Sequence, residues 1–360
     1  MSTRRCRHSQ SVTDCRCESV GFVTGASLVA YLGVTLRNRT VISDVMDQLD
    51  PQLGYIVDNL ERKIVGKRPL MEFMVTAVLA EGHVLLDDVP GVGKTTVATM
   101  LARSLDLSYS RIQCTPDLLP TDITGVTIFH PGTRQFEFHP GPVFANLVIA
   151  DEINRTSPRT QSALLEVMEE GQVTVDGVTH PLEPPFLVVA TQNPIEYEGT
   201  FSLPESQLDR FLFRLNVGYP SIEEESTILS QSDHALPLDS VQSVISRQEL
   251  LERMRSVRDV HVADAMRSYI AKLADATRSS PHIELGMSPR ASLALYRASQ
   301  AWALLHSRDY VIPDDVVKLA PLVVKHRLIL SRTSTNPNGH LVDDVFDNIL
   351  RSVPIPPLAK

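Results

Sequence analysis

The sequence predicts an α/β fold in which helices cover both faces of a parallel five-stranded sheet, followed by an all-α domain. Two observations predict this fold. Short apolar runs with β character alternate with stretches of helical spacing as far as Pro220, and this alternation is typical of parallel strands joined by crossover helices. Beyond Pro220 the apolar residues follow helical spacing alone. The expected strands are residues 83–86, 109–113, 147–150, 186–191 and 211–217.

Helical spacing also precedes the first strand and fills the C-terminal part of the chain. Before the sheet, helices are expected at 45–64, where Pro51 interrupts the pattern, and at 70–79. The C-terminal helices are expected at 222–230, 247–257, 262–279, 289–306 and 313–329. Pro289 and Pro313 fall at first-turn positions, where proline is favoured. We therefore expect a core at 46–220 and a helical domain at 221–234 and 247–355, with a linker at 235–246.

The first 45 residues differ from the rest and are expected to be a disordered extension. A basic start and the uncharged stretch 20–36 resemble a weak signal peptide, but this stretch is too short and too weakly apolar for a membrane span. Two alternatives stay open: a start nearer Met46, or metal binding by the extension. The metal-ligand candidates are Cys6, His8, Cys15 and Cys17, and their spacing matches no common zinc pattern.

Composition indicates an ordinary globular protein. Of the 360 residues, 43% are hydrophobic and 21% are charged, and the formal net charge is −9. This acidic balance gives no argument for nucleic acid or an anionic membrane as the main partner. The four cysteines form no disulfide framework, which favours a reducing, cytoplasmic location.

The stretch HVLLDDVPGVGKTTVA at 83–98 has the pattern of a phosphate-binding loop. A strand, a glycine-rich turn and a helix start place backbone N–H groups and a helix N-terminus around a phosphate. Lys94 would reach the β- and γ-phosphate oxygens of ATP, and the Thr95 hydroxyl would hold Mg²⁺. Asp88 stands where the usual pattern has glycine. The expected nucleotide-binding residues are Pro90, Gly91, Val92, Gly93, Lys94, Thr95 and Thr96.

A second motif, LVIADEINR, ends the third expected strand. It delivers Asp151 and Glu152 to the carboxyl edge of the sheet, where such folds bind their ligand. Asp151 is placed to coordinate Mg²⁺, and Glu152 to activate a water for attack on the γ-phosphate. The fourth strand ends in ATQNP, which puts Asn193 at the same edge to orient that water. Capping of the following helix is the alternative role for the two carboxylates.

The motif order is more specific than any single motif. The chain carries, in this order, the phosphate loop and the motifs DEINR, ATQNP, LPESQLDRF and GMSPRA. This order of motifs resembles that of an AAA+ ATPase, and the residues within the motifs resemble those of the MoxR family. The resemblance covers about residues 64–332 and implies a P-loop NTPase core followed by a helical lid. Residues 1–45 lie outside it. The family itself carries a residue similar to Asp88 at that position.

The resemblance assigns roles to matched positions. It implies that Val65 and Gly66 form the adenine-contacting turn, Asn193 is a sensor, Arg210 is an arginine finger and Arg290 is a second sensor. An arginine at the γ-phosphate stabilises transition-state charge and can raise the rate by about 10³–10⁵. Arg214 is the rival finger. Whether Arg290 acts on its own or a neighbouring subunit's ATP stays open.

Two hairpins are expected between the strands. The first covers 125–138 with a Pro131–Gly132 turn, and the second covers 172–180 with a two-residue Asp176–Gly177 turn. In AAA+ proteins that resemble this chain, such insertions project from the core and are candidates for contacting substrate in a central pore. The alternative is that they only decorate the sheet edge.

The resemblance implies an ATP hydrolase that uses ATP and Mg²⁺ and assembles as a hexamer. Such proteins act like chaperones in the assembly, maturation or activation of other complexes, often metalloenzymes, with a von Willebrand A-domain partner. A slowly hydrolysing regulatory scaffold is one alternative. A DNA-acting motor is another, although the acidic balance and the lack of a basic stripe weigh against it.

Overall fold

The computed structural model describes residues 48–61, 66–87, 94–193, 199–231, 243–331 and 341–357. The chain divides into two units, Met1–Gln48 and Leu49–Lys360, and all the elements below belong to the second. The four metal-ligand candidates near the N-terminus lie outside the described residues.

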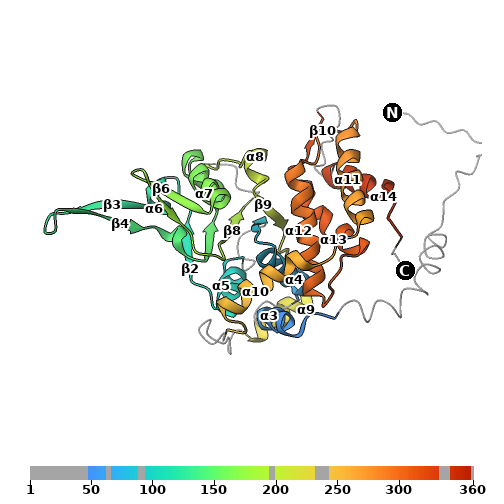
Figure 1. Cartoon of the computed structure of the whole chain (residues 1–360), viewed down its shortest axis with the longest axis horizontal. Helices are drawn as coiled ribbons and strands as arrows, with labels where there is room; N and C mark the ends of the chain where they lie inside the picture. Colours follow the sequence, from blue (N-terminus) through green and yellow to red (C-terminus); the bar gives the residue numbers. More distant parts are fainter. Residues whose placement is uncertain are drawn as a thin grey trace, which may run out of the picture. The chain divides into compact units, whose positions relative to one another are not determined.

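A five-stranded parallel sheet forms the centre of the second unit (Figure 1), and all five expected strands are confirmed. The strands are β1 (His83–Asp87), β2 (Tyr109–Gln113), β5 (Leu147–Asp151), β8 (Leu187–Gln192) and β9 (Phe211–Leu215). Their order in the sheet is β2-β5-β8-β1-β9, so β5, β8 and β1 are central. Because all the strands are parallel, the carboxyl ends of β1, β5 and β8 meet at one edge.

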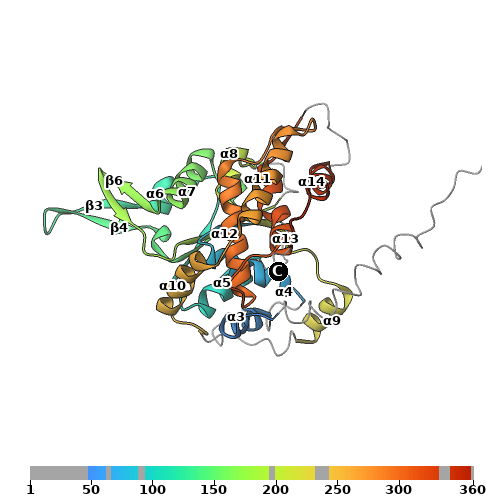
Figure 2. The same ribbon diagram turned by 45° about the vertical axis from the view of Figure 1, so that its right-hand side comes forward.

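Alternation along the central strands divides the apolar side chains between two cores. In β5, Leu147 and Ile149 join the first core, and Val148 and Ala150 join the second. The first core also receives α3 (Pro51–Glu61), α4 (Arg68–Leu79) and α5 (Lys94–Ser104). The second core receives α6 (Pro120–Thr124), the short helix η1 (Pro142–Phe144), and α7 (Pro158–Glu170). Figure 2 shows α4 and α5 on the side of the sheet away from α7. The prediction of helices on both faces is confirmed.

Proline and serine set the helix starts. Pro51 does not interrupt a helix, as the sequence pattern indicated, but begins α3. The Asp50 carboxylate accepts the backbone N–H groups of Gln52 and Leu53 at 3.0 and 3.1 Å, so it satisfies donors that a first turn leaves free. At α7, Ser157 caps the helix ahead of Pro158 in the same way. Each such pair fixes one helix end from local sequence alone.

Both expected hairpins are present. The first pairs β3 (Gly125–His130) with β4 (Gln135–Pro140), and the second pairs β6 (Gln172–Val175) with β7 (Val178–Pro181). Asp176 and Gly177 have positive φ values of 51° and 78°, as a two-residue turn between antiparallel strands requires. In Figures 1 and 2 the β3–β4 hairpin extends farther from the sheet than β6–β7 does.

The C-terminal region is helical, as expected. Its helices are α9 (Ile222–Gln231), α10 (Arg247–Ser256), α11 (Asp264–Ser279), α12 (Pro289–Leu305), α13 (Pro313–Val324) and α14 (Leu341–Ser352). A two-stranded antiparallel sheet, β10 (Ile283–Leu285) with β11 (Ile329–Leu330), adds to them. The sequence pattern indicated neither this sheet nor α14. Short one-turn helices complete the fold: η2 (Ile153–Arg155), α8 (Glu205–Leu208), η5 (Val257–Asp259) and η6 (Lys325–Arg327).

Aromatic rings join the helical region to the core. Phe73 of α4 lies between Trp302 of α12, at 5.3 Å between ring centroids, and Phe213 of β9, at 6.2 Å. On η6, the buried Arg327 donates to the Asp209 carboxylate at 2.7 Å and to the Phe211 carbonyl at 2.6 Å. Burial lowers the pKa of Arg327, and Asp209 opposes that effect. The helical region is therefore fixed to the residues that lead into β9.

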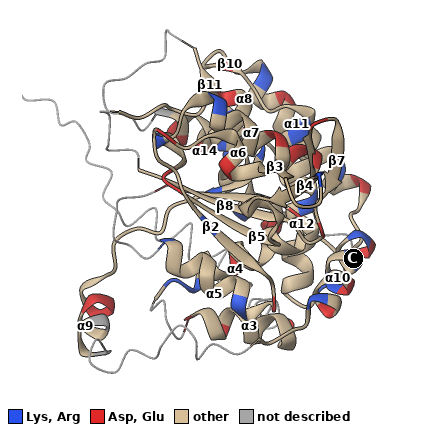
Figure 3. Cartoon of the chain, turned by 90° about the vertical axis from the view of Figure 1, so that its left-hand side faces the viewer, with Lys and Arg blue, Asp and Glu red and all other residues tan. Residues whose placement is uncertain are grey.

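Charges of both signs are mixed along the surface helices. Figure 3 shows acidic and basic segments alternating on α10, with no continuous basic stripe over the elements in view. Among the residues described, no helix is both long and apolar enough to cross a membrane.

Candidate nucleotide site

The polar residues of the two motifs meet at the carboxyl edge of the sheet. Asp151 is the last residue of β5, Asn193 directly follows β8, and α5 begins at Lys94 beside them. The Lys94 ammonium donates to the carbonyl of Gln192 at 3.2 Å, so the start of α5 is tied to the end of β8. Residues 88–93, which include Pro90, Gly91, Val92 and Gly93 of the predicted loop, lie outside the described residues.

Thr95 and Asp151 form a site of the kind that Mg²⁺ prefers. The Thr95 hydroxyl lies 3.1 Å from both carboxylate oxygens of Asp151, and Asp151 is only 4% exposed. A hydroxyl and a carboxylate are hard oxygen donors that suit Mg²⁺. The Arg111 guanidinium, on β2, donates to Asp151 at 2.6 Å. Because Arg111 is more than half exposed, it can turn aside when a cation takes the carboxylate.

Glu152 has a backbone conformation that sets its side chain apart from Asp151. Its φ and ψ of 56° and 51° are left-handed, and a non-glycine residue is rarely held there except at functional sites. The backbone N–H of Glu152 donates to the Thr191 hydroxyl at 2.9 Å. Its carboxylate accepts from Arg155 at 2.8 Å and from Gln113 at 3.3 Å. The carboxylate is thus held by two neighbours at the sheet edge.

Asn193 is buried beside this carboxylate pair. It is 3% exposed, and its backbone carbonyl accepts from the Asn154 side chain at 3.2 Å. The contact fixes the end of β8 to η2, directly after Glu152. The structure therefore brings together Lys94, Thr95, Asp151, Glu152 and Asn193, all predicted from sequence.

The predicted adenine turn is partly described. Gly66 has a φ of 77°, and a Cβ at this position would lie 1.6 Å from the Glu224 carboxylate of α9. Beside it, the Lys67 ammonium donates to the Tyr219 carbonyl at 3.0 Å. Glycine is therefore required where the turn meets the start of α9. Val65, its predicted companion, lies outside the described residues, and Thr96 lies in the first turn of α5.

Arg210 and Arg290 lie at the other end of the sheet. Arg210 directly precedes β9, and Arg290 is in the first turn of α12. Both donate to the same carboxylate, Glu169 at the end of α7, at 2.8 and 3.0 Å. Arg210 also donates to the Leu165 carbonyl, and Arg290 lies 3.9 Å from the Asp209 carboxylate. These two arginines form one cluster, separate from the Asp151 edge.

Arg214, the rival finger, is engaged within its own chain. It lies near the carboxyl end of β9 and pairs with Asp87, the last residue of β1. Asp87 is 8% exposed, and its second carboxylate oxygen has no hydrogen-bond partner among the described residues. Arg214 thus compensates a buried charge.

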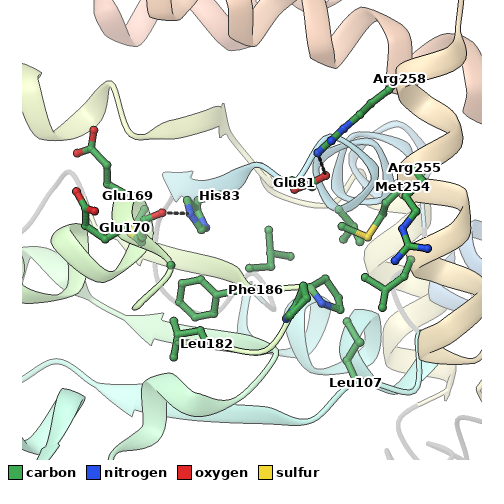
Figure 4. Close-up of a pocket in the computed structure, with 17 residues that line it drawn as sticks. Glu81, His83, Leu107, Glu169, Glu170, Leu182, Phe186, Met254, Arg255 and Arg258 are labelled. Atoms are coloured by element: carbon green, nitrogen blue, oxygen red, sulfur yellow. Dashed lines mark hydrogen bonds and ion pairs between the residues drawn. The ribbon is translucent and has the colours of Figure 1, made fainter. Parts of the chain in front are cut away.

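A cavity of about 420 Å³ lies beside the arginine cluster, bordered by α7, α10 and the starts of β1 and β8 (Figure 4). At its wall, His83 accepts the Val188 N–H at 3.0 Å and lies 3.0 Å from the Met168 carbonyl. Burial lowers the pKa of His83 to about 4, so the neutral ring donates to Met168. This bridge holds the start of β1 to the end of α7, next to Glu169.

Several residues that hold the site together have no role that the sequence predicts. Glu169 lies near the end of a helix and Asp209 lies in the LPESQLDRF motif, where only Arg210 was given a role, and Arg111 and Gln113 lie on an edge strand. Only the sheet order, which places β2 next to β5, brings the last two to Asp151 and Glu152. Cys114 follows them, and burial, then Asp151 and Glu152, raise its pKa to about 12. That thiol is therefore unreactive.

Comparisons with known proteins decide the family. Residues 83–213 match the profile of the "ATPase family associated with various cellular activities (AAA)", and residues 275–349 match the AAA lid domain. The chain is 43% identical to Chaperone MoxR1 of Mycobacterium tuberculosis over 82% of this chain and 80% of that protein. This chain belongs to the MoxR family of AAA+ ATPases.

Two further relatives match most of this MoxR-family chain. YeaC of Bacillus subtilis is 50% identical over 86% of this chain and 97% of its own length. A solved structure of a protein from Cytophaga hutchinsonii is 34% identical, with a TM-score of 0.78 over 92% of this chain and all of the other. The sequence prediction of a MoxR-type AAA+ fold with a helical lid is thereby confirmed.

Proposed function

We propose that this MoxR-family chain hydrolyses ATP with Mg²⁺ and uses the cycle to remodel a client protein complex. One observation carries the hydrolytic part: the Thr95 hydroxyl faces both oxygens of Asp151 at 3.1 Å, with Glu152 next in sequence. This is the arrangement by which P-loop NTPases hold a metal and activate a water. Bound Mg²⁺ would neutralise charge on the β- and γ-phosphates.

Each residue at the Asp151 edge has a role in this proposal. Lys94 binds the β- and γ-phosphate oxygens, and Glu152 accepts a proton from the attacking water. Asn193 orients that water, and Gly66 forms the turn against the adenine. The Glu152 carboxylate must first release Arg155 before it can contact the water, because its oxygen lies 2.8 Å from the Arg155 guanidinium nitrogen.

We propose that Arg210 and Arg290 act on the ATP of a neighbouring subunit. Both lie at the amino end of parallel strands, whereas Lys94 and Thr95 lie at the carboxyl end. A five-residue strand is about 16 Å long, farther than one side chain reaches. Arg214 is the less suitable finger because it compensates Asp87 within its own chain. A ring, expected to be a hexamer, would bring Arg210 to the adjoining site.

Two observations support the client side of the proposal. A MoxR relative is named a chaperone, and the β3–β4 hairpin exposes Phe136 by 74% and Phe129 by 47%. Such exposed aromatic side chains suit contacts with another protein. A von Willebrand A-domain partner, a metalloenzyme client and a cytoplasmic location stay predictions. Mixed charges on α10 (Figure 3) give no support to a DNA-acting motor.

One observation favours a second candidate, a slowly hydrolysing nucleotide switch. Both Arg155 and Gln113 hold the Glu152 carboxylate, so the proposed general base is occupied by neighbouring side chains. If assembly does not release it, ATP would be bound and turned over too slowly for remodelling.

The test measures ATP binding and steady-state turnover of the purified full chain, with Lys94→Ala as the variant that lacks the phosphate contact. The proposal expects Mg²⁺-dependent turnover that rises with protein concentration as subunits assemble, and loss of ATP binding in Lys94→Ala. Binding without turnover at any concentration would favour the switch. No binding would contradict both candidates.

A further inference from the structure

One face of the β3–β4 hairpin gathers two imidazoles and a carboxylate. The strands pair Val126 with His139, Ile128 with Glu137, and His130 with Gln135. Side chains two residues apart along a strand share a face. His130, Glu137 and His139 therefore all lie on the same side of the hairpin, and all three are exposed.

The ligand atoms of these three side chains are already close together. Their imidazole nitrogens and carboxylate oxygen all lie within 4.8 Å of one another, and His130 is 3.4 Å from Glu137. Around one zinc ion, bonds of about 2.0–2.2 Å bring ligand atoms within roughly 4 Å of each other. The side chains of His130 and Glu137 are 50% and 64% exposed, so small rotations can close the remaining gap.

The base of the hairpin is held firmly, which keeps this face in register. Phe138, on the opposite face, stacks on His180 of β7 with ring centroids 4.0 Å apart and meets Phe144 at 5.6 Å. At the end of β4, Gly141 lies so close to the Ile123 carbonyl that a Cβ would be 2.2 Å from it. The three ligands are thus presented on an anchored ribbon and not on a loose loop.

We propose that this hairpin binds one zinc-class divalent ion through His130, Glu137 and His139. Two imidazoles and a carboxylate suit Zn²⁺ or a similar transition metal, whereas Mg²⁺ requires oxygen ligands. The site is therefore chemically distinct from the one at Thr95 and Asp151. Three protein ligands leave a fourth position for water or for a side chain of another molecule. The ion also links β3 to β4 across an exposed two-stranded ribbon, which stiffens it.

The experiment uses the full chain with Cys6, Cys15 and Cys17 replaced by serine, so that thiols near the N-terminus cannot bind zinc. Calorimetric titration with Zn²⁺ is performed in excess Mg²⁺ on this parent and on His139→Ala and Glu137→Gln. The matched control is Gln135→Ala, which changes an exposed side chain on the same face, opposite His130. Metal-free melting temperatures establish that each variant folds as the parent does. Cobalt absorption on the parent reports the coordination geometry.

The proposal expects one Zn²⁺ per parent chain and a low-coordinate cobalt spectrum. In His139→Ala the affinity for Zn²⁺ should fall by more than the ~10–100-fold that loss of an outer-sphere partner causes. Gln135→Ala should bind Zn²⁺ with the affinity of the parent. Zinc should raise the melting temperature of the parent but not of His139→Ala. A parent that takes up no zinc, or a His139→Ala variant that binds zinc like its parent, would overturn it. Neither outcome depends on ATP turnover.

Discussion

At the scale of single residues, the backbone gives two adjacent carboxylates different surroundings. Asp151 is buried against Thr95, and the left-handed backbone of Glu152 turns its side chain toward Arg155 and Gln113. In the proposed mechanism, the strand end supplies the metal ligand and the following turn supplies the general base. A helix-capping role is not observed for Glu152, whose side chain makes no capping hydrogen bond to η2.

We expect Glu152→Gln to bind ATP but to hydrolyse it at least about 100-fold more slowly, because general-base catalysis contributes about 10²–10⁴-fold. ATP affinity and steady-state turnover are measured on the same preparation. Glu284→Gln, an exposed change on β10, is the matched control and should behave as wild type. Wild-type turnover in Glu152→Gln would remove it from catalysis.

Substitution of Arg214 should mainly affect stability, and substitution of Arg210 should mainly affect turnover. Arg214→Ala leaves the buried Asp87 carboxylate unpaired, and we expect it to lower the free energy of unfolding by about 1–3 kcal/mol. Arg210→Ala removes a partly exposed ion pair to Glu169, worth at most ~1 kcal/mol, but should abolish turnover in the ring. Denaturant titration and ATPase assays check the two effects. The reverse pattern would make Arg214 the finger.

At the scale of elements, local sequence predicted most of the fold. The strand runs, the Asp176–Gly177 turn and the proline at the start of α12 each act within a few residues, and all are confirmed. The prediction for Pro51 is wrong because a proline inside an apolar repeat and a proline at a first turn have the same sequence pattern, and only the Asp50 cap distinguishes them. β10 and β11 are two to three residues long, too short for any alternation to show.

The base of the β3–β4 hairpin gives an element-scale prediction. Gly141→Ala would place a Cβ 2.2 Å from the Ile123 carbonyl, a backbone atom that cannot turn aside. We expect the variant to lose about 1–3 kcal/mol of stability, measured by denaturant unfolding. Gly132→Ala is the matched control, because no heavy atom lies within 4 Å of its Cβ at the tip of the same hairpin. Equal stability of the two variants would contradict the close approach.

At the scale of the whole molecule, the arginine cluster is the feature that sequence could not reveal. The resemblance named Arg210 and Arg290, but nothing in the chain relates them to Glu169, which lies 41 and 121 residues away in sequence. Their meeting depends on how α7, β9 and α12 pack. The Asp151 edge was predictable because parallel strands deliver their ends to one place, whereas the Glu169 cluster needs the lid to be placed first.

Acid should destabilise the whole fold through its buried histidines. Burial lowers the pKa of His83 to about 4 and also lowers those of His306 and His326. A histidine in the unfolded chain has a pKa near 6.5. The contribution of neutral His83 to the free energy of unfolding is therefore complete above about that pH, and it decreases by roughly 3 kcal/mol as the pH falls to about 4. Melting temperatures across this window check it. His83→Gln, which can keep both hydrogen bonds, should show a flatter dependence, and an unchanged slope would exclude His83 as a contributor.

Subunit mixing tests whether the two ends of the sheet cooperate between chains. Arg210→Ala keeps Glu152, and Glu152→Gln keeps Arg210, so each variant alone should be inactive in a ring. In mixed rings, an Arg210→Ala site beside a Glu152→Gln neighbour has both groups, and random pairing completes about a quarter of the sites. We therefore expect turnover to return to about that fraction of wild type.

The control for mixing is the double variant Arg210→Ala/Glu152→Gln combined with Arg210→Ala. No site in that mixture contains a finger arginine, so it should stay inactive although rings of the same size form. Light scattering establishes ring formation, and exchange of differently labelled subunits establishes mixing. If the first mixture is as inactive as its control while subunits exchange, Arg210 does not act across the interface. In that case the contact between Arg210 and Glu169 serves the packing of α7 against β9 and not the neighbour's ATP.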